Sequence, residues 1–307
     1  MKIFLSSLSI PVIKRLHKIN PNLKPNVLVT FYGLQRPRDY TITYRSMINE
    51  LILDCGAFSI NNDKKLSVQS RLIESDKLFF KYRDYTKIAQ GRYDFLFSFD
   101  DDFTPNGFTH NLTRLMRLEA DNIKAVPVIH NLHNNEIEFF IKSRPKYQLV
   151  AIGQCQGDNR NDLRVLFNAV DSLYRNGIRV HLFGMTTPSL ISHVPAYSSD
   201  SKAWVDYATR GRALYHNTES GFLDKEELIY FPNKQNFGDP GNAVYYKEYR
   251  HMEAFLAHIK SKLDLELEDL IAAQTQAMSL SLVNVLYFME LEERITEENR
   301  LLGITFP

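Results

Sequence analysis

The chain has 307 residues, of which 44% are apolar and 24% are charged, so it can bury a large core and is not a disordered protein. The formal net charge of +1 gives no overall basic character of the kind that marks many nucleic-acid-binding proteins, although it leaves room for a local basic patch. The two cysteines, Cys55 and Cys155, lie far apart and neither belongs to a C-x-x-C pair. This spacing argues against a structural zinc site and against a disulfide framework.

The first residues, MKIFLSSLSIPVIKRLHK, place an apolar stretch beside a basic residue. Pro11 and the pair Lys14-Arg15 interrupt the stretch, and no small-residue cleavage site follows it. We therefore expect a strand and a helix here rather than a signal peptide. No apolar run in the sequence is long enough to span a membrane, so the sequence predicts a cytoplasmic protein with no membrane partner.

Short apolar runs rich in β-branched and aromatic residues recur along the chain and are the candidate strands. They are residues 2–7, 26–32, 51–58, 93–100, 125–130, 148–154, 179–185 and 196–201. The first seven have the continuous apolar character of parallel strands, which are buried on both faces.

Helical patterns fill most of the gaps between these runs. In residues 67–88 the apolar positions fall near one face, with Leu72 among them, and in residues 161–177 they do the same before Gly177 ends the pattern. Strand and helix alternating in this way predict an α/β fold, a (β/α)₈ TIM barrel, with a doubly wound open sheet as the main rival.

The pattern changes after residue 205. Residues 206–243 show no clear periodicity, whereas a helical pattern that includes Tyr245 and Met252 and a second one around Leu286 follow. We expect residues 1–243 to form the barrel domain. Residues 244–307 should form a C-terminal helical extension packed on the barrel.

Polar residues follow the predicted strands at the ends where barrel enzymes place their chemistry. The polar residues are Asp54, Asp100, His130, Gln154 and Asp200, and the glycines Gly153 and Gly184 lie at two of the same strand ends. Taken alone, each has an ordinary structural explanation. Asp54 precedes a Cys-Gly pair and could cap a loop, and His130 could be a buried structural histidine. The coincidence of three carboxylates at strand ends favours a site instead. The HNLH sequence at 130–133 is not a metal-binding motif, so we expect no metal.

Five short motifs share one order in the chain: LDCGAFS, FSFDDDFTP, VAIGQ, HLFGMTTPSL, and SSDSKAW followed by RGR. They extend over roughly residues 50 to 212. Together they resemble the motifs of the tRNA-guanine transglycosylases, and they are more similar still to phage and bacterial relatives that insert 7-deazaguanines into DNA. The resemblance implies a barrel fold and a base-exchange reaction without a cofactor.

The resemblance also implies catalytic roles. Asp200 takes the place of the nucleophile that binds the sugar, and Asp54 that of the general acid/base. Asp100 matches the aspartate that reads the guanine edge. Phe58 and Phe183 match the residues that cover the two faces of the base, and such stacking is worth about 1–3 kcal/mol per base.

Further positions follow from the same motifs. Gly153 and Gln154 lie in the segment that contacts the base, Gly184 follows Phe183, and His130 stands where the family has a glutamine. Nucleic acid would be bound by basic residues near Asp200, namely Lys202, Arg210 and Arg212. The family's glutamine after the DSGGF motif is Ser59 here, and the cysteine-rich zinc site of the tRNA enzymes is missing. This loss favours DNA over tRNA as the substrate.

The sequence thus predicts a transglycosylase that replaces guanine in DNA with a 7-deazaguanine resembling preQ0. The protein would act in the cytoplasm, which would be that of the host if a phage encodes it. Three alternatives stay open: the same reaction on tRNA, a barrel hydrolase that releases a base or uses a metal, and an inactive relative that binds nucleic acid. The identity of the incoming base and the oligomeric state are not predicted.

Overall fold

The computed structural model describes the chain except for residues 64, 66, 154–161, 219–225, 233–239 and 307. Parallel strands run around its centre: with one break, between the fifth and the sixth, each pairs with the next in chain order, and the last pairs with the first. They are β1 (Lys2–Ser6), β2 (Asn26–Thr30), β3 (Leu51–Asp54), β4 (Phe95–Phe97), β5 (Ala125–Val126), β6 (Val128–Ile129), β7 (Leu149–Ile152), β8 (Arg179–Leu182) and β9 (Ser198–Ser201).

One strand of this sheet is interrupted, and the ring of paired strands is therefore nearly closed. β5 pairs with β4, and β6 pairs with β7, while only Pro127 separates β5 from β6. Proline has no N–H to donate, which splits one strand into two short pieces. All eight predicted strands and the α/β barrel are thereby confirmed.

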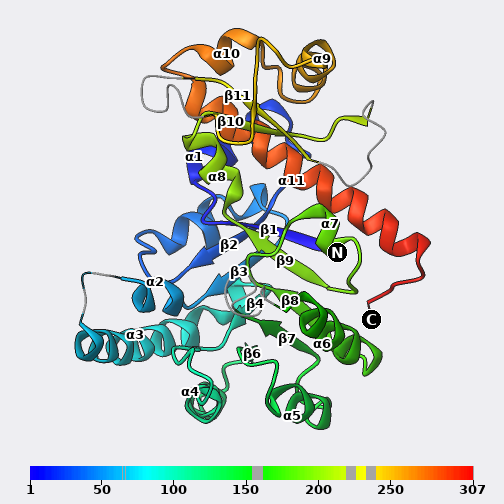
Figure 1. Cartoon of the computed structure of the whole chain (residues 1–307). Helices are drawn as coiled ribbons and strands as arrows, with labels where there is room; N and C mark the ends of the chain where they lie inside the picture. Colours follow the sequence, from blue (N-terminus) through cyan, green and yellow to red (C-terminus); the bar gives the residue numbers. More distant parts are fainter. Residues whose placement is uncertain (64, 66, 154–161, 219–225, 233–239, 307) are drawn as a thin grey trace.

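Helices follow most of the strands and form the outer layer in Figure 1. They are α1 (Ile10–Ile19), α2 (Ala57–Asn61), α3 (Val68–Ala89), α4 (Phe108–Ala120), α5 (Glu136–Lys142), α6 (Leu163–Arg175), α7 (Pro188–Ile191) and α8 (Ala203–Thr209). After β2 the chain forms only a π-helical turn (Asp39–Thr43) and a 3₁₀ turn (Arg45–Met47).

The helix at 67–88 was predicted correctly, but one of its residues was placed on the wrong face. Leu72 is 64% exposed, whereas Leu78, Phe79 and Tyr82 are buried. Leu72 lies one turn before Ser75, where the buried face of α3 begins. Among the helix residues whose burial the structure describes, the buried ones begin at Ser75.

Two apolar cores hold the barrel. One lies between the strands and the outer helices, and the second fills the barrel interior. The interior cluster consists of Phe4, Leu28, Ile52, Phe97, Val126, Val128 and Ala151, with Phe95, Leu149 and Phe183 packed against it. Such filling is typical of eight-stranded barrels, whose centre is a packed core and not a channel.

A small sheet stands beside the barrel and was not predicted. It contains β10 (Arg212–Tyr215), β11 (Glu227–Tyr230) and β12 (Val244–Tyr245). The chain then continues through α9 (Met252–Leu263) and α10 (Leu267–Ile271) to the long helix α11 (Gln276–Leu301). Tyr245 therefore belongs to a strand and not to the helix that its spacing predicted, because that helix begins only at Met252.

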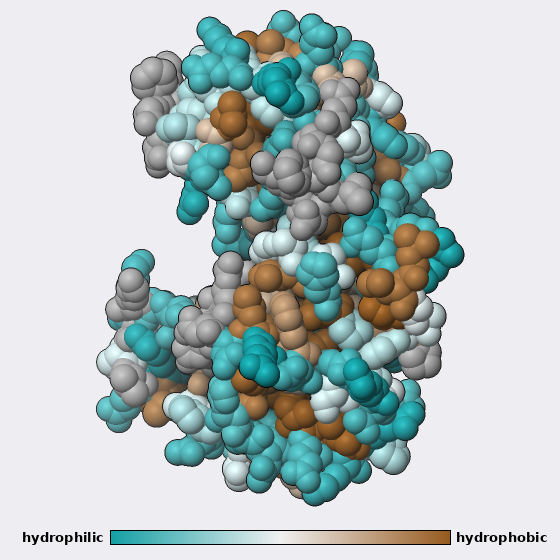
Figure 2. All heavy atoms as spheres, turned by 45° about the vertical axis from the view of Figure 1, so that its right-hand side comes forward, coloured by the Kyte–Doolittle hydropathy of each residue, from teal (hydrophilic) through white to brown (hydrophobic). Residues whose placement is uncertain are grey.

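Helix α11 joins the small sheet to the barrel. It packs against α8, β10 and β1, and Figure 1 shows it passing from the small sheet across the barrel. In the space-filling view a deep indentation separates the upper part of the molecule from the barrel on one side (Figure 2). Within the described residues, no helix has both the length and the apolar character that crossing a membrane requires.

Candidate active site

Three aspartates meet at the carboxyl ends of the barrel strands. Asp54 is the last residue of β3, Asp100 follows β4, and Asp200 lies in β9. Burial of the Asp54 carboxyl group, reinforced by the negative charges of Asp100 and Asp200, raises its pKa from 3.8 to about 8. Asp54 is therefore mostly protonated at neutral pH, beside two further carboxyl groups.

The turn after Asp54 holds its carboxyl group in place. Gly56 donates its backbone N–H to Oδ2 of Asp54 at 3.0 Å. Gly56 has a φ of +89°, and a Cβ at this position would lie 2.4 Å from Cβ of Tyr32. Only glycine fits such a turn. Asp54 thus caps its loop, as the structural explanation expected, but it also faces the other carboxylates.

Asp100 is buried and fixed at both carboxylate oxygens. The Cys55 thiol donates to Oδ1 at 3.3 Å, and Nε2 of His130 lies 2.8 Å from Oδ2. Each carboxylate oxygen keeps a second lone pair, so Asp100 can still accept hydrogen bonds from a ligand. Gly153 lies directly behind the histidine, because a Cβ there would be 2.6 Å from Cε1 of His130.

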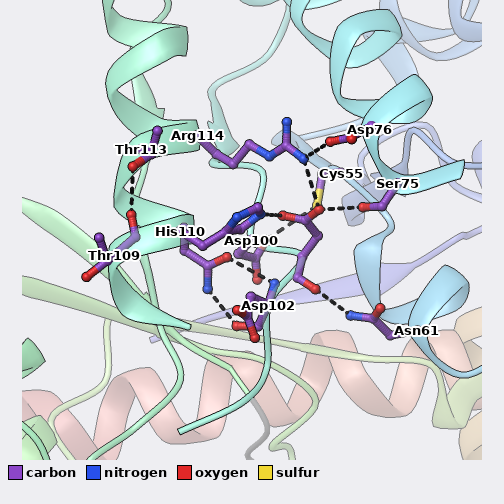
Figure 3. A network of polar contacts seen from close by, with 12 residues as sticks. Cys55, Asn61, Ser75, Asp76, Asp100, Asp102, Thr109, His110, Thr113 and Arg114 are labelled. Carbon is purple, nitrogen blue, oxygen red and sulfur yellow. Dashed lines mark hydrogen bonds and ion pairs between the residues drawn. The ribbon is translucent and has the colours of Figure 1, made fainter. Parts of the chain in front are cut away.

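The two residues after Asp100 anchor the segment to α3 and α4, whose side chains Ser75 and Arg114 point toward it (Figure 3). The Asp101 carboxylate accepts hydrogen bonds from Ser75 at 2.5 Å and from the buried Arg114 at 3.4 Å, and its other oxygen lies 2.8 Å from Nε2 of His110. The Arg114 guanidinium also pairs with Asp76. These contacts tie the strand end to α3 and α4.

Backbone contacts complete this anchoring. Asn61 donates to the carbonyl of Asp101 at 2.9 Å, and Asn111 both donates to the carbonyl of Asp102 and accepts from its N–H. Asp101 and Asp102 are held by these helices, whereas the Asp100 carboxylate contacts His130, which follows β6. Among the described residues, Asp100 is the one of the three consecutive aspartates that contacts another candidate site residue, His130.

Asp200 is buried, and hydrogen-bond donors surround its carboxylate. The Ser6 hydroxyl donates to Oδ2, and the backbone N–H of Gly184 donates to Oδ1 at 2.8 Å. The strand end that carries Ser6 is fixed in turn by Trp204, whose indole N–H donates to the Ser6 carbonyl at 3.0 Å. The only tryptophan of the chain therefore supports the residue that orients Asp200.

The two predicted stacking residues, Phe58 and Phe183, lie in different surroundings. Phe58 is 66% exposed, and its nearest described aromatic ring is that of Phe103, with centroids 6.4 Å apart. Phe103 also packs on His130 at 4.6 Å. Phe183 instead packs against Phe97, with centroids 4.5 Å apart. The structure therefore places Phe103, and not Phe183, beside Phe58.

Sequence reasoning missed Phe103, although its position carried a signal. It lies in the FDDDFTP motif, directly after the three aspartates. An aromatic residue close behind a strand-end carboxylate is a candidate for stacking on a flat ligand.

The three predicted basic residues do not share one environment. Lys202 and Arg210 are exposed at the two ends of α8. Arg212, also predicted to bind nucleic acid, is only 8% exposed, because it lies in β10 with its guanidinium against Gly241. Gln154, predicted to contact the base, lies outside the described residues.

A cavity of about 440 Å³ opens at the carboxyl ends of β1 and β2. Its wall includes Ser7, which follows β1, and Thr30, which ends β2, and the exposed Arg36 lies on its outer side. Its described lining contains none of the three aspartates, and Thr30 connects it to them because it is paired with Asp54 in the sheet. The cavity is large enough for a small organic group.

Among the residues that the structure describes, no group of three or more histidine, cysteine, aspartate or glutamate side chains is arranged to hold a metal ion. Comparison with known protein families found no family that matches this chain, and comparison with curated proteins found no match either. The geometry itself combines a protonated carboxyl group with two other carboxyl groups at one barrel mouth. That combination suits acid–base chemistry coupled to nucleophilic attack.

Proposed function

We propose that the chain is a base-exchange transglycosylase that replaces guanine in DNA with a 7-deazaguanine through a covalent link between Asp200 and the sugar. The observation that carries the proposal is the pairing of Asp54, whose pKa is raised to about 8, with Asp200 at the same barrel mouth. The reaction requires a proton donor for the leaving base and a nucleophile for the sugar. A carboxyl group that keeps its proton can take the first role, and an ionised one beside it can take the second.

In the first half-reaction an Asp200 carboxylate oxygen attacks C1′ of the sugar. The bond between C1′ and the base breaks, and its electron pair leaves with the base. The proton of Asp54 passes to the ring nitrogen that is released. The transition state resembles an oxocarbenium ion, which the adjacent carboxylate stabilises. The products are a sugar ester of Asp200 and a free guanine.

The second half-reaction runs in reverse with another base. Asp54, now ionised, removes a proton from the ring nitrogen of the incoming 7-deazaguanine. That nitrogen attacks C1′ and displaces Asp200, which returns as a carboxylate. Protons and electrons balance over the cycle, so no cofactor takes part.

Asp100 is the group that we assign to base recognition. Its two oxygens are held by Cys55 and His130, and their remaining lone pairs can accept from the N1–H and the exocyclic amine of guanine. Adenine has no donor at either of these places. The exposed ring of Phe58, with Phe103 beside it, offers a surface on which a flat base can stack.

A base in duplex DNA must be flipped out of the stack to reach this site, at a cost of a few kcal/mol. Stacking on Phe58 would recover part of this cost, and the exposed cations Lys202 and Arg210 could contact the phosphates. DNA is preferred to tRNA on the resemblance of the motifs. The incoming base is assigned only as a 7-deazaguanine.

The test is incorporation of a labelled base. The purified protein is incubated with labelled guanine or a 7-deazaguanine and with either duplex DNA or tRNA, and label in the nucleic acid is measured. We expect incorporation into DNA, and we expect Asp200→Ala to abolish it while leaving binding of the nucleic acid nearly unchanged. Asp206→Ala, which removes an exposed carboxylate from the neighbouring helix α8, is the matched control and should retain activity.

Other outcomes separate the alternatives. Release of guanine without any incorporation would indicate a hydrolase, and incorporation into tRNA alone would indicate the RNA enzyme. Binding of nucleic acid with neither reaction would indicate an inactive relative. Normal turnover by Asp200→Ala would rule out this aspartate as the nucleophile.

A further inference from the structure

His181 lies inside the barrel, directly below the mouth. It belongs to β8 and is fully buried. Aromatic rings surround it: Phe97 and Phe183 have centroids 4.8 Å from the imidazole, and Phe4 is at 6.2 Å. A histidine in such apolar surroundings is costly unless its polar atoms find partners.

The polar neighbours of His181 both come from β9. Its Nδ1 lies 2.9 Å from the Ser198 hydroxyl, and its Nε2 lies 3.5 Å from Oδ1 of Asp200. Within the described part of the chain, Nε2 has no hydrogen-bond partner. The nitrogen is therefore buried and within ion-pair distance of the proposed nucleophile.

Among the described residues, the groups that contact His181 include one carboxylate, that of Asp200. Phe4 from β1, Phe95 and Phe97 from β4 and Phe183 directly after β8 contribute rings, and β9 contributes Ser198 and Asp200. Any charge on the imidazole is thus opposed by Asp200, with little screening by water inside the barrel.

We propose that His181 is a positioning residue for Asp200: its imidazolium, when protonated, pairs with the carboxylate and keeps it ionised and oriented for attack. The consequence for catalysis rests on the proposed base exchange, but the charge pair itself does not. The pairing explains how Asp200 can stay ionised at a mouth that already contains Asp54 and Asp100, while Asp54 retains a proton.

In the reaction, His181 forms no bond and gives up no proton. Asp200 loses its negative charge when its oxygen bonds to C1′, and the electron pair of the broken bond leaves with the base that Asp54 protonates. When the second base displaces the sugar, the carboxylate charge returns next to the imidazolium. His181 therefore favours the free carboxylate over the ester, which promotes the second half-reaction.

The charge pair is tested by NMR, without any substrate. The imidazole nitrogens are titrated with pH in the wild-type protein and in Asp200→Asn, with Asp200→Ala as a second variant in case the first folds poorly. If the two groups form a charge pair, the imidazole signals of His181 should respond to pH differently in the variants than in the wild type. His258 is the internal control, because its Nε2 lies 3.2 Å from an oxygen of Glu290 and not from Asp200. Its signals should respond to pH in the same way in all three proteins. A pH response of the His181 signals that is unchanged in both variants would overturn the proposal.

The catalytic consequence is tested with His181→Phe and His181→Gln. Phenylalanine keeps the ring packing but removes both nitrogens, whereas glutamine keeps a donor that can reach Asp200. We expect the exchange rate of His181→Phe to fall at least tenfold, its pH profile to shift to higher pH, and His181→Gln to recover part of the rate. An unchanged pH profile in a folded His181→Phe protein would contradict the assignment.

The base-exchange assay and the NMR measurement test different claims, so a negative result in one leaves the other to be decided. If the wild-type protein exchanges no base on any nucleic acid, the proposed function is wrong, whereas the NMR result still decides whether His181 and Asp200 form a charge pair. If exchange occurs but the pH response of the His181 signals is insensitive to Asp200, only the role of His181 is wrong.

Discussion

The protonation state of Asp54 is set by its burial and by the charges of its neighbours. Its position at a strand end was predicted from the sequence, but its protonation state depends on burial and on two residues from distant parts of the chain, Asp100 and Asp200. The contact between Asp100 and His130 likewise depends on the fold, because neither residue type alone indicates it. Residue identity therefore indicated which carboxyl groups lie at strand ends, and only the fold shows that burial and the neighbouring charges keep the proton on Asp54.

The raised pKa of Asp54 predicts a pH-dependent stability. The native carboxyl group keeps its proton up to about pH 8, whereas in the unfolded chain it is released near pH 3.8. Between these values the native state binds more protons, so this group makes the protein less stable as the pH rises. Above pH 8 both states are ionised and the cost stays constant.

Asp54→Asn removes this cost. The thermal midpoint of the variant relative to the wild type should rise from pH 5 to pH 8 and then level off, while base exchange is lost. Thermal unfolding at several pH values measures the effect, with Asp206→Asn as a control on an exposed carboxylate. A difference between variant and wild type that is independent of pH would contradict the raised pKa.

Gly153 predicts a defect in base recognition. A methyl group at this position would lie 2.6 Å from the His130 ring, so Gly153→Ala should displace His130 from Asp100. We expect weaker binding of guanine and a loss of stability of about 1–3 kcal/mol, the usual cost of overpacking. Gly91→Ala is the control, because a methyl group there meets no atom within 4 Å. Equal guanine affinity in Gly153→Ala and the wild type would show that His130 has no part in guanine binding.

At the scale of elements, the strands of the barrel were predicted well because parallel strands buried on both faces leave long apolar runs. The small sheet was missed for a physical reason. β10 and β11 are short, β12 covers only Val244 and Tyr245, and they lie in a segment without periodicity. The burial of Arg212 was missed for the same reason, since it follows from a strand that the pattern did not reveal.

Helix α8 and strand β1 are coupled through Trp204. Trp204→Phe keeps an aromatic ring but leaves the Ser6 carbonyl without the indole N–H, which should cost about 1–3 kcal/mol of stability. Because the Ser6 hydroxyl donates to Asp200, we also expect a slower exchange at saturating substrate. Denaturant unfolding and single-turnover kinetics measure the two effects. An exchange rate equal to that of the wild type would show that the indole supports the fold alone.

For the whole molecule, α11 links the C-terminal part of the chain to the site. Asn284 is fully buried, donates to the carbonyls of Trp204 and Arg212, and accepts from the N–H of Leu214. At another point of the same helix, Glu292 accepts from the N–H of Ile3 in β1. The sequence predicted helices packed on the barrel, but a single buried asparagine that joins α8, β10 and α11 leaves no pattern in the sequence.

The central claim is that Asp200 bonds to a sugar while Asp54 manages the proton of the base. The most direct measurement is peptide mapping by mass spectrometry after the protein has been incubated with a guanine-containing DNA oligonucleotide and quenched with denaturant. We predict an adduct of the oligonucleotide on Asp200 in the wild-type protein, and none in Asp200→Ala. Adduct formation should be strongly reduced in Asp54→Asn, whose side chain has no acidic proton to give the leaving base. Base exchange without any adduct on Asp200, or an adduct on another residue, would contradict the account.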